Sequence, residues 1–293
     1  NNTNYVENKF SKKRKYEFAN SNENSKNSLY KKRNNQQYSH KENVLDDLIW
    51  GKHSVLAVLE SQSAVNRIWC TSEIRSSEKF FLLLKEFKSR GVLIEEVSWT
   101  RISQITSGGV HQGIVLQKSY AQTTSLNNLI ENAKTKSSHA TLICLDGITD
   151  PHNVGAIVRS AEAFGCNGII LPQRRSSGLT GTVAKVAAGA LENIEVSRVV
   201  NLNRALSELK DNGFIIVGLS ADASESITEF NLKVPLVIVI GSENKGLSLL
   251  TQKNCDYLLR IPLFGKTSSL NASVAAAISI FQLSKKHQTI NKN

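Results

Sequence analysis

The stretch R-I-P-L-F-G-K-T-S-S-L-N-A-S-V-A-A-A-I-S, residues 260–279, decides the fold. An apolar, strand-like run ends near Leu263, Gly265 turns the chain, and Asn271 stands where the N-cap of a helix belongs. The helix that follows consists almost wholly of small residues, which favours close approach to neighbouring backbone. A capped helix in a crowded place is one interpretation, and a loop that lines a functional site is the other.

Two further strand ends carry polar residues. In L-D-G-I-T-D-P-H-N-V-G-A-I-V-R, residues 145–159, we expect Asn153 to cap a helix that also bears Gly155 and Arg159. In V-I-V-I-G-S-E-N-K-G-L, residues 237–247, Glu243 follows a buried strand that ends at Gly241. Ligands of parallel α/β sheets bind at the carboxyl ends of the strands. Alone, however, each stretch is also explained by a capped helix or a solvated turn.

Strands and helices alternate through residues 141–283, and this pattern predicts an α/β domain with a mostly parallel sheet at 141–293. The expected strands are 141–145, 168–171, 194–199, 214–219, 236–240 and 257–261. A smaller α/β domain is expected at 46–120, with helices at 53–61 and 77–90 and strands at 65–71, 92–97 and 113–118. Residues 121–140 are interpreted as a linker that contains a short helix.

The net charge of +11 indicates a polyanionic partner, with nucleic acid ahead of a membrane surface. Residues 1–45 hold ten Lys or Arg and four Asp or Glu, so this segment carries more than half of the excess. Its composition predicts a disordered basic tail. The tail could bind RNA, or it could be a solvent-exposed segment whose basic composition has no function. An organelle transit peptide is a weaker third interpretation.

Several classes of protein are disfavoured. The four cysteines form no CxxC pair, so we expect free thiols, no disulfide and no metal site. The longest apolar runs are too short to span a bilayer, and no secretory signal is expected. The chain contains neither a Walker A loop nor G-x-G-x-x-G. We expect a cytoplasmic protein, with an organelle matrix as the weaker alternative.

Taken together, the three stretches resemble the SpoU (TrmH) family of RNA ribose 2′-O-methyltransferases, within the SPOUT superfamily. The positions that match the three family motifs, in order, are Asn153, Gly155 and Arg159; Gly241, Glu243, Gly246 and Leu247; and Ile261, Pro262, Leu263, Gly265, Ser269, Leu270, Asn271, Ser273, Val274 and Ala275. Residues 49–60 and 110–116 look like the edges of the family's N-terminal RNA-recognition domain, and the L-D-G-I-T-D-P-H-N run is most similar to the RlmB branch, which methylates a guanosine ribose in 23S ribosomal RNA.

The resemblance implies a C-terminal trefoil knot and a homodimer with the active site at the interface. It implies that S-adenosylmethionine contacts backbone near Gly241, Ile261 and Leu270, and that the substrate is large-subunit ribosomal RNA. A transfer RNA substrate is the alternative within this enzyme class. A non-catalytic RNA-binding assembly protein on the same fold is the alternative outside it.

The resemblance also assigns roles to side chains. Arg159 would clamp the phosphate and stabilise the alkoxide at the target hydroxyl, because a guanidinium that stays protonated is a poor base; base catalysis by this residue stays open. Asn153 would hydrogen-bond the ribose or Arg159, and Glu243 would orient Arg159 or the knot loops. Ser269 and Asn271 would line the pocket. Separately, Arg174 and Arg175 follow a predicted strand end and are candidate RNA contacts, with a solvated charged loop as the alternative.

Overall fold

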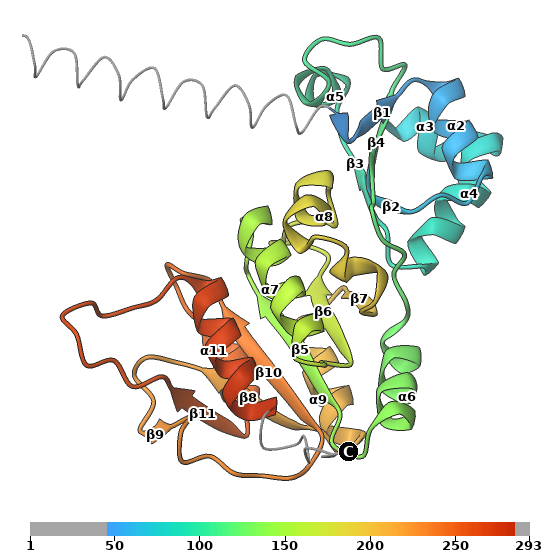
Figure 1. The fold of residues 1–293 in the computed structure, drawn as a ribbon. Coiled ribbons are helices and arrows are strands. Elements are labelled where there is room, and N and C mark those ends of the chain that lie inside the picture. Colours follow the sequence, from blue (N-terminus) through green and yellow to red (C-terminus); the bar gives the residue numbers. More distant parts are fainter. Residues whose placement is uncertain (1–45, 285–293) are drawn as a thin grey trace, which may run out of the picture. The chain divides into compact units, whose positions relative to one another are not determined.

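The computed structural model describes residues 46–284; the predicted tail at 1–45 lies outside them, as do residues 285–293 (Figure 1). The C-terminal part forms a seven-stranded sheet in the order β7-β6-β5-β10-β8-β11-β9, and all of its strand pairs are parallel. The prediction of a mostly parallel α/β sheet is therefore confirmed.

The elements of this part follow one another as strand, helix and connecting loop. The strands are β5 (Thr141–Asp146), β6 (Gly168–Pro172), β7 (Val196–Val199), β8 (Ile215–Leu219), β9 (Glu225–Ser226), β10 (Leu236–Gly241) and β11 (Tyr257–Arg260). The helices are α7 (Pro151–Ala163), α8 (Gly181–Ala187), the 3-10 turn η1 (Ala190–Glu192), α9 (Leu202–Asp211), α10 (Leu249–Asn254) and α11 (Ala272–Ser284). The two-residue strand β9 was not predicted, because so short a strand leaves no apolar run.

The sheet is buried on both faces, which explains its near-continuous apolar strands. Alternate residues of β5 show this: Ile143 packs in one core together with side chains of α7 and α11, whereas Leu142 packs in a second core with α9. Both residues are fully buried. Figure 1 shows α7 and α11 side by side in front of the strands, with α9 behind them.

The adjacency of β5 and β10 positions the site. These strands are neighbours although about ninety residues separate them, and their carboxyl ends are in register, with Asp146 opposite Gly241. The chain leaves β5 toward β6 and β7 on one side, whereas β10 has β8 on its other side. Such a divergence of connections is where parallel sheets place their ligands.

The N-terminal part is a four-stranded sheet in the order β1-β4-β2-β3. Its elements are β1 (Leu48–Trp50), α2 (Lys52–Glu60), β2 (Val65–Cys70), α3 (Ser72–Ser76), α4 (Glu78–Ser89), β3 (Leu93–Glu96), α5 (Trp99–Ile105) and β4 (Ile114–Lys118). Ile68 and Cys70 of β2 pack in one core with residues of α2, α3 and α4. Arg67 and Trp69 alternate with them along β2 and therefore point to the opposite face. The short elements β1, α3 and α5 were not predicted.

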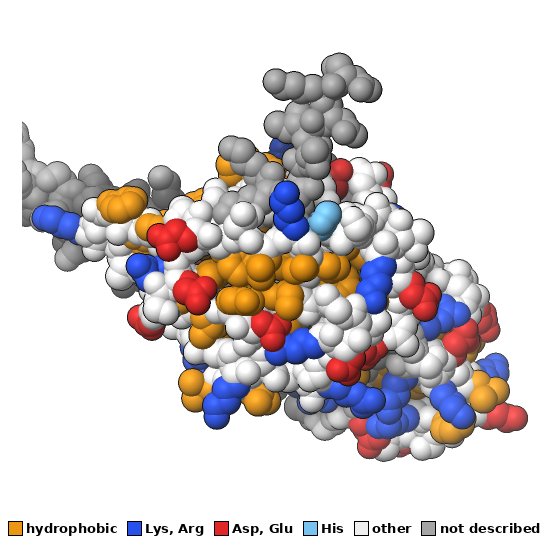
Figure 2. All heavy atoms as spheres, turned by 90° about the horizontal axis from the view of Figure 1, so that it is seen from below, with side chains coloured by type: hydrophobic (Ala, Val, Ile, Leu, Met, Phe, Trp, Pro, Cys, Tyr) orange, Lys and Arg blue, Asp and Glu red, His pale blue; other side chains and the backbone are white. Residues whose placement is uncertain are grey.

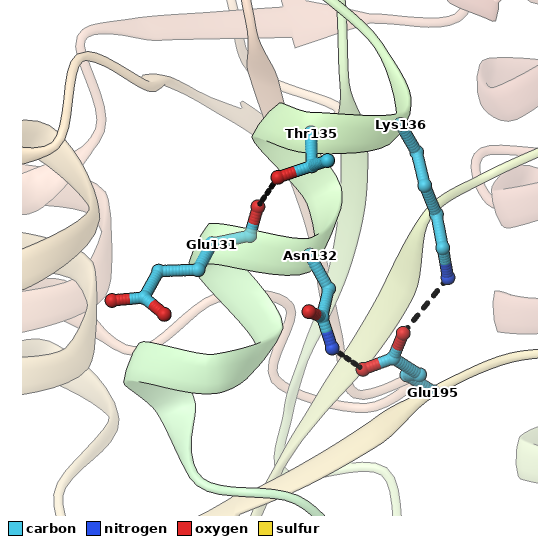
Figure 3. Close-up of polar contacts among 5 residues, drawn as sticks. All are labelled: Glu131, Asn132, Thr135, Lys136 and Glu195. Carbon is cyan, nitrogen blue, oxygen red and sulfur yellow. Dashed lines mark hydrogen bonds and ion pairs between the residues drawn. The ribbon is translucent and has the colours of Figure 1, made fainter.

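Residues 121–140 contain a helix, as predicted: α6 (Leu126–Lys136), which packs on the C-terminal sheet. Glu195, just before β7, accepts hydrogen bonds from Asn132 Nδ2 at 2.9 Å and from Lys136 Nζ at 2.8 Å (Figure 3). Burial opposes ionisation of this carboxyl, but the contacts from Lys136 and Asn132 outweigh it and lower the pKa of Glu195. Two independent bonds thus fix α6 against the sheet.

The start of α7 corrects one prediction. The N-cap is Asp150 and not Asn153: Oδ1 of Asp150 accepts a hydrogen bond from the backbone N–H of His152 at 2.9 Å. Pro151 occupies the first helical turn, where its missing N–H costs nothing. Asn153 therefore lies inside the helix, and its side chain is available for another contact.

Figure 2 shows one face of the molecule, on which basic and acidic side chains are interspersed around a central apolar area. The positive excess is therefore not gathered into a single field on that face. No helix in the described part of the chain, residues 46–284, is long and apolar enough to cross a membrane.

Candidate active site

Three side chains from distant parts of the chain meet at the carboxyl ends of β5 and β10. Oε1 of Glu243 accepts a hydrogen bond from Nδ2 of Asn153 at 2.9 Å and a shorter one from Nδ2 of Asn271. Nδ2 of Asn271 also donates to Oδ1 of Asn153 at 3.0 Å. The backbone N–H of Ala272 donates to the same Glu243 oxygen at 3.4 Å. We call Asn153, Glu243 and Asn271 the amide–carboxylate cluster.

Asn271 has two roles that fix the orientation of its amide. Its Oδ1 accepts hydrogen bonds from the backbone N–H groups of Ser273 at 2.9 Å and Val274 at 3.3 Å, so Asn271 caps α11, as predicted. With the oxygen turned to the helix, the NH₂ group must face Glu243. An aspartate could cap the helix equally well, but it would repel Glu243. Asparagine alone among the preferred caps supplies both an acceptor and a two-hydrogen donor.

A cleft of about 320 Å³ adjoins the cluster. It is lined by the segments that follow β8, β10 and β11, and its lining includes Gly241, Glu243, Ile261, Ser269 and Leu270, all of which the sequence singled out. Asn271 is not part of the lining and reaches the cleft only through Glu243. Apolar side chains and exposed backbone share the cleft with the carboxylates of Asp222 and Glu243 and the ammonium group of Lys245. Such a mixture suits a ligand with an apolar ring and a cationic group.

Gly241 is required by the packing of the loop that follows it. A Cβ at this position would lie 2.2 Å from the carbonyl carbon of Gly246 and 2.4 Å from the backbone nitrogen of Leu247. The loop folds back because Ser242 and Gly246 exchange two backbone hydrogen bonds, of 3.1 and 2.8 Å. Gly246 has a φ of 60°, a backbone conformation that residues with a side chain rarely adopt. The conformation of this wall of the cleft therefore depends on both glycines.

Gly155 is required by the packing of α7 against α8. A Cβ there would lie 2.7 Å from Val186 Cβ and 2.8 Å from the carbonyl oxygen of Val183. Gly155 therefore allows α7 and α8 to pack closely, and the neighbour it admits is backbone of α8.

Arg159 does not join the amide–carboxylate cluster within the same chain. It is exposed on α7 and does not line the cleft beside Glu243. Six helical positions separate it from Asn153, which corresponds to about 9 Å along the axis and about 240° of rotation. The two residues therefore lie on different faces of α7.

The two candidate RNA contacts are separated by the structure. Arg174 lines a second cleft, of about 580 Å³, together with Arg67, Trp69, Arg75 and Arg101. Arg175, whose φ is 57°, is exposed and does not line it. Sequence reasoning missed the residues of β2 and α5, although a tryptophan two positions from an arginine in a predicted strand was a usable signal. It also missed Asp222, a carboxylate shortly after the predicted strand at 214–219.

The described residues offer neither a metal cluster nor a reactive cysteine. Within residues 46–284, no group of three or more His, Cys, Asp or Glu side chains could hold a metal ion. His111 is buried between Ser103 and the backbone of Gly113, and burial lowers its pKa. All four cysteines are free, and burial raises the pKa of Cys166 to about 12. These thiols are therefore protonated at neutral pH.

Two family models match this chain. The model described as "SpoU rRNA Methylase family" matches residues 140–281, and the model described as "RNA 2'-O ribose methyltransferase substrate binding" matches residues 48–124. An uncharacterised tRNA/rRNA methyltransferase of Synechocystis is 51% identical over 81% of this chain, which spans 62% of that relative's length. A putative TrmH family tRNA/rRNA methyltransferase of Bacillus subtilis is 37% identical, over 84% of this chain and 98% of the relative.

Solved structures have the same fold. An rRNA methyltransferase of Sinorhizobium meliloti with bound AdoMet superimposes with a TM-score of 0.52 at 23% identity, over 82% of this chain and 87% of that one. The SpoU methyltransferase AviRb of Streptomyces viridochromogenes in complex with AdoMet gives 0.51 at 20% identity, over 82% and 89% of the two chains. At these identities the likeness establishes the fold.

Proposed function

The chain belongs to the SpoU rRNA methylase family of S-adenosylmethionine-dependent RNA methyltransferases, and from this premise we propose that it methylates a ribose 2′-oxygen, on a guanosine of large-subunit ribosomal RNA. The observation that carries the proposal is the amide–carboxylate cluster beside the cleft at Gly241. A non-catalytic protein on this fold would have no need to keep Asn153 of α7, Glu243 of the loop after β10 and Asn271 at the start of α11 hydrogen-bonded to one another.

The cleft fits S-adenosylmethionine by its chemistry. Leu219, Ile240 and Leu247 offer apolar surface for an adenine ring, and the carboxylates of Asp222 and Glu243 lie on the same cleft for the cationic and hydroxyl groups. Gly241, Ile261 and Leu270, which all line the cleft, would hold the cofactor through backbone contacts. When bound, S-adenosylmethionine supplies an electrophilic methyl group on a sulfonium centre.

The residues of the chain act mainly by positioning, which can supply a large part of the barrier reduction for an in-line displacement. Glu243 fixes the side-chain amides of Asn153 and Asn271, and Asn271 in turn fixes the start of α11. Asn153 would orient the target ribose, and Ser269 would line the pocket beside it. Arg159 would hold the neighbouring phosphate and stabilise negative charge on the attacking oxygen.

Arg159 would reach such a site in a homodimer. It is exposed on α7, and α7 packs against α11. Val274, Ile278 and Phe281 are spaced along one face of α11 and are 46%, 40% and 48% exposed. We infer that this exposed apolar stripe is the surface on which a second copy of the chain docks. A second copy of the chain on this stripe would lie beside Arg159.

The substrate is tested by mapping 2′-O-methyl groups by mass spectrometry on RNA from cells with and without the protein. The proposal expects one guanosine mark in large-subunit ribosomal RNA to disappear with the protein. Its return on incubation of the unmodified RNA with purified protein and S-adenosylmethionine completes the test. Loss of a transfer RNA mark, with ribosomal RNA unchanged, would replace the ribosomal substrate by a transfer RNA.

A further inference from the structure

The second cleft, of about 580 Å³, lies away from the amide–carboxylate cluster and has the chemistry of a nucleic-acid contact. Four arginines line it: Arg67 from β2, Arg75 from α3, Arg101 from α5 and Arg174 from the loop after β6. Two glutamates of β3, Glu95 and Glu96, also line it. The formal charge of the lining is therefore positive even when both carboxylates are ionised.

Only two of the four arginines form ion pairs with residues of 46–284. Arg67 and Arg75 contact Glu95 and Glu96 at 3.7 and 3.1 Å. Arg101, in contrast, donates from its side chain only to the neutral Gln104, at 3.2 Å, and Arg174 makes no ion pair or side-chain hydrogen bond with any residue of 46–284. Two guanidinium groups at this cleft are therefore free to bind anions.

A stacking surface lies between these charges. The guanidinium of Arg67 sits over the ring of Trp69, 5.4 Å from its centroid, and both side chains are half-buried on the sheet face that α2 and α4 do not cover. Unpaired bases stack on aromatic rings and on guanidinium planes. Two simpler roles do not explain this pair. Packing in a core would not require the arginine, and binding of a phosphate alone would not require the tryptophan.

Positive charge is crowded behind this surface. Arg198 of β7 donates to the backbone oxygens of Asn66 and Gln173, at 2.7 and 3.3 Å, but its Nε is buried without a partner among the described residues. Burial, and then the charge of Arg67, lowers the pKa of Arg198 to about 10. An anion bound at the cleft would relieve this repulsion.

We propose that this cleft binds an unpaired segment of the substrate RNA, with a base stacked on the Arg67–Trp69 surface and phosphates held by Arg101 and Arg174. The inference rests on the proposed RNA substrate and adds where on the chain that RNA is gripped. Because stacking requires an exposed base face, single-stranded RNA binds here in preference to a duplex.

Binding of a mixed-sequence 12-nucleotide single-stranded RNA and of the matching duplex to the full chain tests this. The double variant Arg101→Gln/Arg174→Gln is expected to lower the slope of log Kd against log salt by about 1.4, the value for two lost phosphate contacts on a single strand. The matched control Lys79→Gln/Lys85→Gln removes the same charge from exposed positions of α4 that do not line the cleft. If the slope falls equally in both double variants, the effect comes from net charge alone and the proposal is overturned.

Trp69 is tested separately, by substitution and by tryptophan fluorescence. The chain has three tryptophans, and all of them lie between residues 50 and 99. Trp69→Leu is expected to weaken single-strand binding roughly 5- to 160-fold, the range for loss of one stacked base. Trp69→Phe keeps an aromatic face and should bind within a few-fold of the parent, with less fluorescence quenching on RNA addition. Equal binding by Trp69→Leu, with an unchanged melting temperature, would refute the stacking site.

Cofactor binding and methyl transfer separate this proposal from the proposed function. The cleft variants should keep the affinity for S-adenosylmethionine and raise the KM for RNA more than they lower kcat. If they retain full RNA affinity while the protein transfers methyl groups, the cleft is not the RNA site and the enzyme assignment stands. If the parent protein neither binds RNA nor transfers methyl groups, both proposals fall.

Discussion

Glu243 accepts a hydrogen bond from Asn153 at 2.9 Å, although 90 residues separate them. Asn153 is only 6% exposed, whereas Glu243 is exposed and lines the cleft. A single carboxylate oxygen thus connects a buried amide of α7 to the cap of α11.

Glu243→Ala removes the acceptor of two side-chain amides and one backbone N–H. The buried amide of Asn153 then loses a partner, and the start of α11 is no longer tied to α7. We expect methyl transfer to fall at least ~100-fold, because small displacements of positioned groups have effects of that size. Initial rates with tritiated S-adenosylmethionine measure it. Asn244→Ala, at the next residue and outside the cleft lining, is the control and should stay within a few-fold of the parent.

Asn271→Asp separates the two roles of this side chain. Aspartate caps helices as well as asparagine does, so α11 and the thermal unfolding midpoint should change little. The new carboxylate would nevertheless face Glu243 where an NH₂ group now donates. We expect activity to be lost without loss of stability. A variant that unfolds earlier yet keeps its activity would show that capping is the residue's only role.

Gly241→Ala introduces a methyl group where backbone atoms lie 2.2 to 2.5 Å away. Overpacking of this kind costs about 1–3 kcal/mol or forces the loop to move. Because Gly241 and the loop it contacts form a wall of the cleft, we expect weaker S-adenosylmethionine binding in calorimetry as well as a lower melting temperature. Gly265→Ala is the stability control, since nothing lies within 4 Å of a Cβ there. Equal melting temperatures for the two variants would contradict the packing argument.

The ion pair between Lys136 and Glu195 gives a pH-dependent prediction. The pKa of Glu195 is lowered in the folded chain, so its stabilising contribution is present above the ordinary carboxyl pKa and is lost as the pH falls through the folded value. Lys136→Met should therefore cost up to about 1 kcal/mol of unfolding free energy at pH 7 and less at pH 3, which lies below the ordinary carboxyl pKa. Urea unfolding at both pH values measures the difference.

The control for that experiment lies two residues away on the same helix. Lys134 donates to the neutral side chain of Asn212 at 3.3 Å. Lys134→Met should therefore have an effect that carries no comparable dependence on pH. A Lys136→Met effect that is the same at pH 3 and pH 7 would mean that the ion pair contributes little.

Much of the fold could be predicted because its information is local. The strands of the large sheet are continuous apolar runs, such as β10, and such runs identify buried parallel strands. Strand ends then predicted that Asn153, Glu243 and Asn271 would approach one another, and they do. The cap of α7 was predicted wrongly because Asn153 is a good cap by type, whereas Asp150 followed by Pro151 is the stronger start signal.

The rest depends on tertiary relationships that no local pattern encodes. Arg174 and Arg175 are adjacent residues of the same type, so the sequence gives no reason to distinguish them. In the structure Arg175 has a positive φ and Arg174 does not. The elements β1 and α3, of three and five residues, are too short to show periodicity. The trefoil knot and the roles of Ser269, Ile261 and Leu270 remain predictions from the resemblance. The domain boundaries at 46, 121 and 141 also remain predictions, made from composition and from the pattern of apolar residues.

The position of Arg159 leads to the last prediction. Arg159→Ala should abolish methyl transfer while S-adenosylmethionine binding stays close to that of the parent, because the side chain lies outside the cleft. If Arg159 serves the site of a second copy, then Arg159→Ala and Glu243→Ala, each inactive alone, should complement when the two proteins are unfolded together and refolded. A mixed dimer would hold one site with both residues intact, and random pairing makes about half of the dimers mixed. Activity near a quarter of the parent value is therefore expected. No recovery, with mixed dimers demonstrated by mass spectrometry, would place Arg159 at the site of its own chain and would require α7 to reorient when RNA binds.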